Sequence, residues 1–167
     1  MPPYPDIGYR GSLQRRSESA IIQIMDDVKA RIVQGDCAEA LREFPSESFD
    51  LIVTSPPYAD QRKATYGGIK AELYNQWFLE RSSEFLRVLK PTGTFILNIK
   101  EKVEDGQRHT YVLELILALR LQGWLWTEEF IWHKKNCHPG KWPNRFRDAW
   151  EYPYQCSTIS SHSEVIV

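Results

Sequence analysis

The stretch that most constrains the fold of this 167-residue sequence is an apolar run that ends in two prolines. Residues 49–55, FDLIVTS, are almost continuously apolar, which is typical of a strand covered on both faces of a sheet. Pro56 and Pro57 then stop the strand, because proline has no amide donor and fixes its own φ. Proline also restricts the preceding residue to extended backbone. The sequence therefore predicts a stiff corner, Ser55-Pro56-Pro57-Tyr58, whose carbonyl oxygens face little competition from local N–H groups.

Strand-like and helix-like segments alternate around this corner. Residues 148–156 begin like a final strand, although Pro153 disfavours a central position in a sheet. The alternation predicts an α/β fold in which helices cover a largely parallel sheet, and residues 1–18 read as an N-terminal arm. The predicted strands are 31–36, 49–55, 94–100 and 124–134, and the predicted helices are 20–30, 37–44, 71–89 and 110–123.

Two finer expectations concern the interior of this fold. Gly123 is expected to close the helix over 110–123. Residues at helical spacing are expected to form the buried face of the helix over 71–89; they are Leu73, Trp77, Phe78, Phe85, Leu86 and Leu89. The four tryptophans on later predicted strands, Trp124, Trp126, Trp132 and Trp150, fit core positions better than surface ones.

Polar residues follow three of the predicted strands. Gly35-Asp36, the corner at 55–58 and Asn98 each lie at the carboxyl end of a strand. Ligands of such sheets bind at the carboxyl ends of the strands. These residues are therefore expected to form one site.

The corner suits a planar ligand that carries an exocyclic amine. Proline-flanked carbonyls and the Ser55 hydroxyl can accept hydrogen bonds from the amine, and the Tyr58 ring can stack on the ligand face. The alternative is a plain strand-ending turn with a surface tyrosine. These four residues alone leave both interpretations open.

The longer context resembles a known family. The corner resembles motif IV of the DNA amino-methyltransferases, and residues 35–68 resemble the opening of a beta-class enzyme of restriction–modification systems, near the PvuII type. LKPTGTFILNIK and FIWHKKNCHPGKWPNRFRDAWEY resemble later strands and a loop of the same class. The similarity covers roughly residues 31–152 and implies a partial Rossmann-like, S-adenosylmethionine-dependent methyltransferase fold.

The resemblance implies roles for particular residues. The target base is flipped out of duplex DNA, Ser55 and the Pro56–Pro57 corner accept from its amine, and Tyr58 stacks on it. The amine attacks the methyl group directly, so no cysteine is needed. A serine at the first position of the motif favours cytosine N4, with adenine N6 as the alternative. Asp36 and Asn98 correspond to cofactor-binding positions, although Asp36 fits equally well as a helix N-cap.

Basic residues gather in two predicted loops. The net charge of −1 means that DNA binding must come from local patches. Phosphate contacts are expected from these loops, with ordinary solvated lysines as the alternative. The candidates are Arg62, Lys63, Lys70, Lys134, Lys135, Lys141, Arg145 and Arg147, and Asn144 or Arg145 could instead reach a base edge or brace the pocket.

One segment that the resemblance calls for is not found. The chain has no GxG sequence, whereas the family uses a glycine-rich strand to hold the cofactor. We therefore expect a catalytic-motif part over 19–156, a divergent tail over 157–167, and a fragment or split enzyme that needs a complementary C-terminal chain. An inactive remnant is an open alternative, as is a related RNA or protein amide methyltransferase.

Other classes of protein are disfavoured by composition. No apolar stretch approaches the roughly 20 residues of a membrane span, and residues 1–20 lack the apolar core of a signal peptide. Three cysteines without CxxC spacing suggest free thiols in the cytoplasm. Cys137-His138 alone is a weak metal signal, so no metal site is expected.

Overall fold

The computed structural model describes residues 20–25, 28–60, 68–136 and 149–158. The chain divides into two units, residues 1–36 and 37–167, and each is described by itself.

The first unit contains a β-hairpin. Strand β1 (Ala20–Met25) pairs antiparallel with β2 (Val28–Ile32). The helix expected over 20–30 is therefore wrong, because closely spaced β-branched residues such as Ile21 and Ile22 favour extended backbone. The buried strand expected over 31–36 is also wrong: β2 ends at Ile32, and residues 31–36 are exposed.

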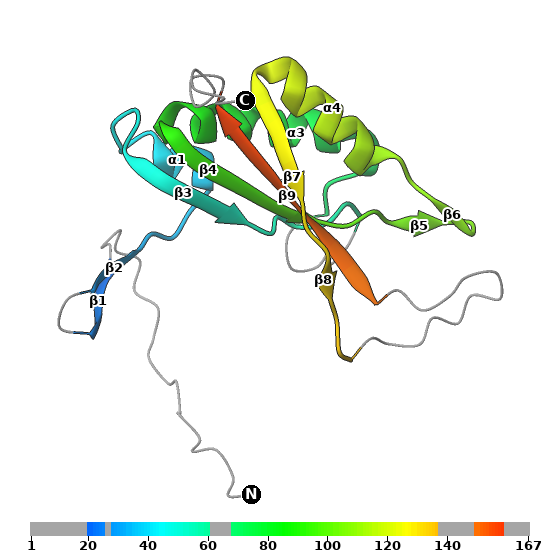
Figure 1. Ribbon diagram of the computed structural model, residues 1–167, viewed down its shortest axis with the longest axis horizontal. Coiled ribbons are helices and arrows are strands. Elements are labelled where there is room, and N and C mark those ends of the chain that lie inside the picture. The colour runs from blue at the N-terminus through cyan, green and yellow to red at the C-terminus, as the bar shows by residue number, and fades with distance from the viewer. Residues whose placement is uncertain (1–19, 26–27, 61–67, 137–148, 159–167) are drawn as a thin grey trace, which may run out of the picture. The chain divides into compact units, whose positions relative to one another are not determined.

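The second unit is an α/β layer structure. Its sheet has the order β3-β4-β9-β7, and β8 pairs with β9 (Figure 1). β3 and β4 are parallel, and β9 runs antiparallel to β4, β7 and β8. All strands of this sheet except β9 therefore share one direction. The elements are α1 (Cys37–Leu41), β3 (Phe49–Thr54), α3 (Ala71–Val88), β4 (Leu89–Ile99), β5 (Val103–Glu104), β6 (Gln107–Arg108), α4 (Tyr111–Gln122), β7 (Trp124–Glu129), β8 (Trp132–His133) and β9 (Trp150–Thr158).

The core lies between this sheet and the pair α3 and α4, which Figure 1 shows on the same side of the sheet. Alternate residues of β4, namely Phe95, Leu97 and Ile99, are buried, as the period of two of a strand requires. The Phe95 ring contacts Trp124 of β7 at 4.8 Å between centroids and Phe85 of α3 at 5.6 Å. Aromatic contacts therefore join the sheet to the helices.

The helices agree with the predicted spans and differ in one detail of their buried faces. α4 ends at Gly123, whose φ of 113° is the left-handed conformation expected at such a position. On α3, however, Leu73 is exposed, so its expected place on the buried face is wrong. The buried face runs through Tyr74, Phe78 and Phe85, because their spacing of four and seven residues follows the helix more closely.

Strand β9 lies inside the sheet, although Pro153 disfavoured that position. The Pro153 carbonyl accepts a hydrogen bond from the Phe130 N–H at 2.9 Å, and the N and O of one strand residue point to the same side. The missing donor therefore faces the break between β7 and β8, where the ladder is already interrupted. Proline is tolerated there because no ladder hydrogen bond is lost.

Strand β3 lies at one end of the sheet and is less covered than its sequence suggested. Ile52 packs against the core, but Leu51 and Val53 point to the other face and are 53% and 63% exposed. Coverage on both faces was therefore a wrong expectation. Within the described residues, no strand pairs with the outer edge of β3.

The four tryptophans expected in the core differ in their exposure. Trp124 is buried, as expected, and its indole N–H donates to the buried Ser82 hydroxyl at 2.7 Å. Trp126, Trp132 and Trp150 are exposed, so the core positions expected for them are wrong.

Candidate active site

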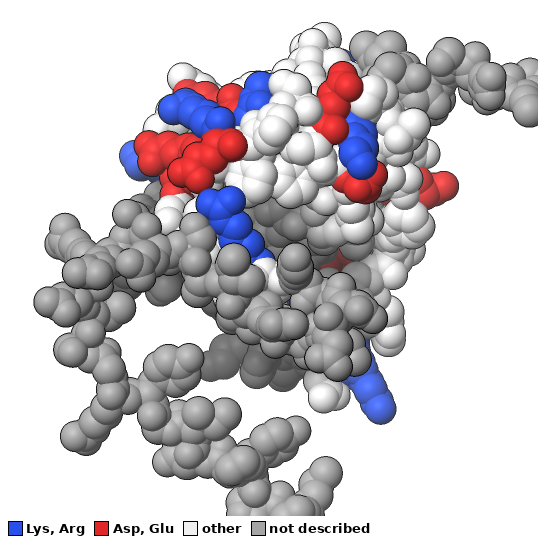
Figure 2. Space-filling model, turned by 90° about the vertical axis from the view of Figure 1, so that its left-hand side faces the viewer, with Lys and Arg blue, Asp and Glu red and all other residues white. Residues whose placement is uncertain are grey.

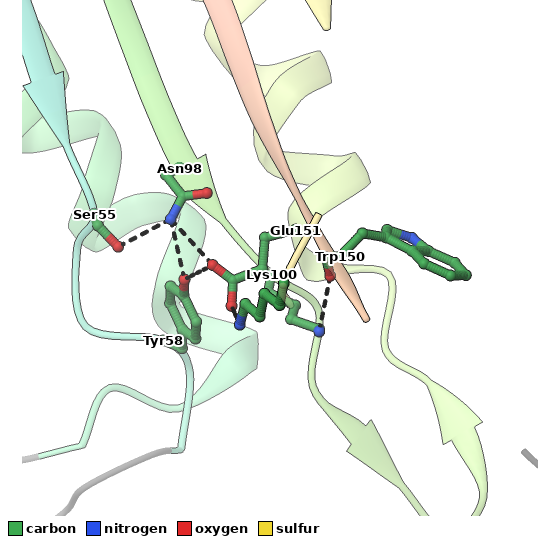
Figure 3. A network of polar contacts seen from close by, with 7 residues as sticks. Ser55, Tyr58, Asn98, Lys100, Trp150 and Glu151 are labelled. Atoms are coloured by element: carbon green, nitrogen blue, oxygen red, sulfur yellow. Dashed lines mark hydrogen bonds and ion pairs between the residues drawn. The ribbon is translucent and has the colours of Figure 1, made fainter. Parts of the chain in front are cut away.

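The predicted corner lies at the carboxyl end of β3, beside the carboxyl end of β4. Asn98 of β4 points toward Ser55 and Tyr58, and Glu151 of β9 lies on the far side of Tyr58 (Figure 3). The parallel pairing of β3 with β4 brings Ser55 and Asn98 to one edge, because parallel strands end on the same side of a sheet. The antiparallel β9 enters the sheet at this edge, which is why its second residue reaches the site.

Two buried tyrosines form hydrogen bonds with backbone groups at and next to the corner. The Tyr74 hydroxyl of α3 donates to the Pro57 carbonyl at 2.8 Å. The Tyr111 hydroxyl of α4 donates to the Lys100 carbonyl and accepts from the Ala59 N–H. Burial raises the pKa of both phenols well above its ordinary value, so they remain protonated donors. The corner is therefore fixed to the helix layer on both sides of Tyr58.

The described residues that flank residues 61–67 are held close together. The Asp60 N–H donates to the Ile69 carbonyl at 2.8 Å, and Lys102 forms an ion pair with the Asp60 carboxylate at 2.6 Å. Asp60 has a φ of 57°, a conformation that aspartate adopts more readily than most residues. These contacts fix where the chain leaves the corner and where it returns.

The acceptors of the corner differ in accessibility, since Ser55 is exposed and Pro56 is buried. Ser55 is exposed, and its Oγ lies 3.4 Å from the Asn98 amide nitrogen, which is a weak hydrogen bond. The Pro57 carbonyl is occupied by Tyr74. No hydrogen bond from a described residue reaches the Pro56 carbonyl. Ser55 Oγ is thus the exposed acceptor of the corner, whereas the carbonyl of the buried Pro56 has no hydrogen-bond partner among the described residues.

Glu151 connects the remaining polar groups of the site. Its Oε2 accepts from the Tyr58 hydroxyl at 2.9 Å and from Asn98 Nδ2 at 3.1 Å, while Oε1 pairs with Lys134 (Figure 3). Burial alone would raise the pKa of Glu151, but hydrogen bonds from Lys134, Asn98 and Tyr58 outweigh it and lower the pKa. The carboxylate is therefore ionised at neutral pH.

The Tyr58 phenol is held in its neutral form. Burial raises its pKa; a hydrogen bond from Ser55 lowers it; the nearby Glu151 carboxylate raises it further. The ring lies half-buried at the corner, with its hydroxyl tethered to Glu151. The hydroxyl end of an aromatic side chain is thus held between Glu151 and the exposed Ser55.

Three residues of this site were not predicted from the sequence: Glu151, Tyr74 and Tyr111. Tyrosines on predicted helices carry no local signal that separates a site residue from a core residue. Glu151 did carry one. It is the only charged residue of the aromatic strand WEYPYQCST, and a carboxylate in such a strand is rarely buried without partners.

The basic residues predicted to contact DNA are described only in part. Lys135 is exposed, Lys70 directly precedes α3, and Lys134 pairs with Glu151. Contact of these lysines with phosphate stays a prediction. The other candidates lie outside the described residues; they are Arg62, Lys63, Lys141, Asn144, Arg145 and Arg147.

The predicted cofactor residues are separated between the two units. Asn98 lies in the site, whereas Asp36 belongs to the first unit and directly precedes α1. The fit to S-adenosylmethionine is incomplete: of the glycines whose surroundings are described, Gly35 faces open space, but Gly93 lies against Leu89 and Gly123 ends a helix. None of them forms a glycine-rich cradle. A cofactor-binding role for Asp36 and Asn98 therefore stays a prediction.

The described residues contain no group of three or more His, Cys, Asp or Glu side chains that could hold a metal ion. Within the same ranges, no helix is long and apolar enough to cross a membrane.

Known proteins resemble the chain over most of its second unit. A family model described as DNA methylase, for N6 and N4 methyltransferases, matches residues 49–162. The type II methyltransferase M.PvuII of Proteus hauseri is 32% identical over 116 residues, which cover 66% of this chain and 34% of that protein. The DNA adenine methyltransferase YhdJ of Escherichia coli K12 is 35% identical over 77 residues, 43% of this chain and 26% of that protein.

A solved structure shares the fold. The PvuII DNA methyltransferase, named as cytosine-N4-specific, aligns with a TM-score of 0.64 at 32% identity, over 74% of this chain and 47% of that chain. The chain thus spans about a third of the curated M.PvuII and about half of the solved structure. The expected α/β, Rossmann-like methyltransferase fold is confirmed. With its matched residues 49–162 and the corner that they contain, the chain belongs to the N6/N4 DNA methylase family.

Proposed function

We propose that the chain carries the catalytic corner of a methyltransferase that modifies DNA in the cytoplasm. S-adenosylmethionine would supply the methyl group, and the acceptor would be the exocyclic amine of a base flipped out of the duplex. The observation that carries this proposal is the exposed Ser55 hydroxyl beside the tethered Tyr58 ring.

The corner would act by positioning and by hydrogen bonding. Ser55 and the Pro56 carbonyl would accept from the two N–H groups of the amine, which directs its lone pair out of the ring plane. Tyr58 would stack on the base, a contact worth about 1–3 kcal/mol in other proteins. Tyr74 and Tyr111 would keep the corner in place while the base binds. Catalysis would therefore rest on orientation and electrostatics.

We infer that the modified atom is cytosine N4. A serine at the first position of the corner supports this choice, as does the similarity to the cytosine-N4-specific PvuII enzyme. The similarity to an adenine methyltransferase supports adenine N6 as the alternative. Nucleoside analysis of DNA methylated by the protein separates the two, since N4-methylcytosine and N6-methyladenine differ in mass.

The test of the proposal is methyl transfer to duplex DNA by the wild type and by two variants. Ser55→Ala and Tyr58→Ala are each expected to lower kcat by a factor of about 100, because each removes a group that orients the amine. Ser83→Ala is the control, since Ser83 is exposed on α3 and bonds only to the Glu80 carbonyl. Full activity in both corner variants would contradict the proposed role.

We further propose that a complementary polypeptide segment completes the domain at β3, either as a continuation of a longer chain or as a separate chain. The outer edge of β3 pairs with no described strand, and the apolar Leu51 and Val53 are more than half exposed beside it. Figure 2 looks at the side on which β3 lies; outside the grey regions, acidic and basic side chains are mixed, with uncharged surface between them. The exposed apolar side chains of Leu51 and Val53 suit strand addition better than they suit contact with DNA.

A further inference from the structure

Glu151 is the only buried charged side chain among the described residues, at 5% exposure. It lies on β9, two strands away from the corner, so it is not itself one of the acceptors of the corner. Burying a carboxylate is costly unless all of its oxygens find partners. The arrangement therefore calls for an explanation beyond the packing of β9.

The Glu151 carboxylate contacts three polar side chains of the site. Oε2 accepts from the Tyr58 hydroxyl at 2.9 Å and from Asn98 Nδ2 at 3.1 Å, and Oε1 pairs with Lys134. The lysine balances the charge, so the other oxygen can act purely as an acceptor for two side chains of the corner. One residue of β9 thus joins the ends of β3 and β4.

The contact with Tyr58 fixes the direction of its ring. The backbone of Tyr58 is held at the corner by its neighbours, since Pro57 bonds to Tyr74 and Ala59 to Tyr111. The bond to Glu151 adds a second fixed point at the far end of the ring. A ring held at both ends keeps the direction of its long axis, and that direction decides whether the ring lies where a base bound at Ser55 can stack on it.

The contact with Asn98 fixes the orientation of its amide. An ionised carboxylate only accepts hydrogen bonds, so the Asn98 NH₂ group must face Glu151. This leaves Asn98 Oδ1 buried without a partner among the described residues, and such orphaned acceptors are uncommon in native proteins. The Glu151 carboxylate thus holds the Asn98 amide in an orientation that leaves Oδ1 without a partner. This cost points to a role for Glu151 in the site.

We propose that Glu151 is a positioning residue, which holds the Tyr58 ring and the Asn98 amide in the orientation that the amine-bearing base requires. The role of Glu151 in the reaction rests on the proposed function, whereas its hydrogen bonds to Tyr58 and Asn98 do not. Glu151 touches neither base nor cofactor. It acts through Tyr58 and Asn98.

The first test measures the geometry in solution without any enzymatic assay. Tyrosine labelled with ¹³C at Cζ is titrated by NMR, and Tyr58→Phe identifies the Tyr58 signal. Glu151→Gln is expected to lower the pKa of Tyr58, because the removed charge disfavours the phenolate. Glu101→Gln is the matched control: its carboxylate pairs with Arg108 at 3.2 Å and does not contact Tyr58. An unchanged Tyr58 pKa in Glu151→Gln would overturn the inference.

A second variant keeps the test valid if Glu151→Gln does not fold. In Tyr58→Phe the carboxylate loses one donor, so the pKa of Glu151, followed through ¹³C-labelled glutamate, is expected to rise. Tyr58 is only half-buried, and removal of its hydroxyl leaves the core intact. A Glu151 signal that titrates identically in this variant and in the wild type would equally overturn the inference.

The second test measures the functional consequence by a double-mutant cycle. Glu151→Gln is expected to lower kcat by a factor of about 100 with little change in KM for DNA, because a misplaced ring loses orientation and not affinity. In a Tyr58→Phe background the same substitution is expected to have a much smaller effect. Equal effects in both backgrounds would show that Glu151 does not act through Tyr58. If Glu151→Gln shifts the pKa of Tyr58 as expected but the wild type, supplied with the complementary segment, methylates no DNA, the proposed function is refuted and the geometry stands.

Discussion

At the scale of single residues, the site is decided by a few buried hydroxyls and one carboxylate. Tyr74 and Tyr111 hold the backbone of the corner, and Glu151 holds the Tyr58 side chain. Each of these groups lies far from residues 55–58 in sequence, and each hydrogen bond replaces a contact with water. A corner that would be an ordinary turn in isolation thus becomes a rigid acceptor site.

The depressed pKa of Glu151 makes a prediction about acid stability. Its folded pKa lies below the ordinary value of 4.5, so its contribution is fully present above pH 4.5 and is lost as pH falls through the folded pKa. Glu151→Gln is expected to cost about 2 kcal/mol at pH 7, where the wild type has its ionised hydrogen bonds. The free energy of unfolding, measured with urea between pH 7 and pH 3, should therefore fall less in the variant than in the wild type. A variant that loses as much stability on acidification as the wild type would argue against the ionised pair.

At the scale of elements, one buried hydrogen bond connects the helix layer to the edge strand β7. The Trp124 indole N–H donates to Ser82 Oγ at 2.7 Å, and both residues are fully buried. The Trp124 ring also packs on Phe95 of β4. α3, β4 and β7 therefore meet at one indole ring.

Removal of the Ser82 hydroxyl is expected to destabilise this junction. Ser82→Ala leaves the buried indole N–H without an acceptor, which costs about 1–3 kcal/mol. The neighbouring Ser83 offers a matched control, because its hydroxyl lies on the exposed side of the same helix. Ser83→Ala should change the free energy of unfolding by less than about 0.5 kcal/mol. Chemical unfolding curves of the two variants compare these costs directly, and equal values would refute the role of the Ser82–Trp124 bond.

At the scale of the whole molecule, the sheet is covered well on one face and poorly at one end. The helix layer buries Phe95, Leu97 and Ile99, whereas Leu51 and Val53 of β3 remain exposed on the other face. The chain also spans about half of the solved PvuII structure that it resembles. The exposed apolar side chains of β3 support the proposed complementary segment.

Strand addition at β3 would be visible in hydrogen exchange. The amides on the outer edge of β3 are expected to exchange rapidly in this chain and slowly after the complementary segment is added, since strand pairing protects them. Val53→Lys should block that protection while changing the stability of this chain by no more than about 0.5 kcal/mol, because the side chain is exposed. Amides of β3 that are already protected in this chain alone would contradict a free edge.

Much of the second unit follows from local rules. The spans of α3, α4 and β3 and the Gly123 helix end agree with the sequence prediction. Three other predicted elements exist with different bounds: α1 ends at Leu41, β4 begins at Leu89, and the strand predicted over 124–134 is divided into β7 and β8. Apolar periodicity, proline geometry and glycine conformation act over a few residues, so the sequence expresses them directly. The Ser55–Tyr58 corner and its neighbour Asn98 could be predicted for the same reason. Both lie at strand ends, and parallel strands share an edge.

Other features depend on partners that are distant in the chain, and only the tertiary structure decided them. β9 takes an inner position because the break between β7 and β8 tolerates Pro153. Residues 20–32 form a hairpin and not the predicted helix, because the pairing of two strands decides their conformation. Glu151 reaches Tyr58 across 93 residues of sequence. The sequence by itself determined where the acceptors of the corner lie, and the fold determined which side chains hold them, because hydrogen bonds across a sheet depend on strand order and not on local spacing.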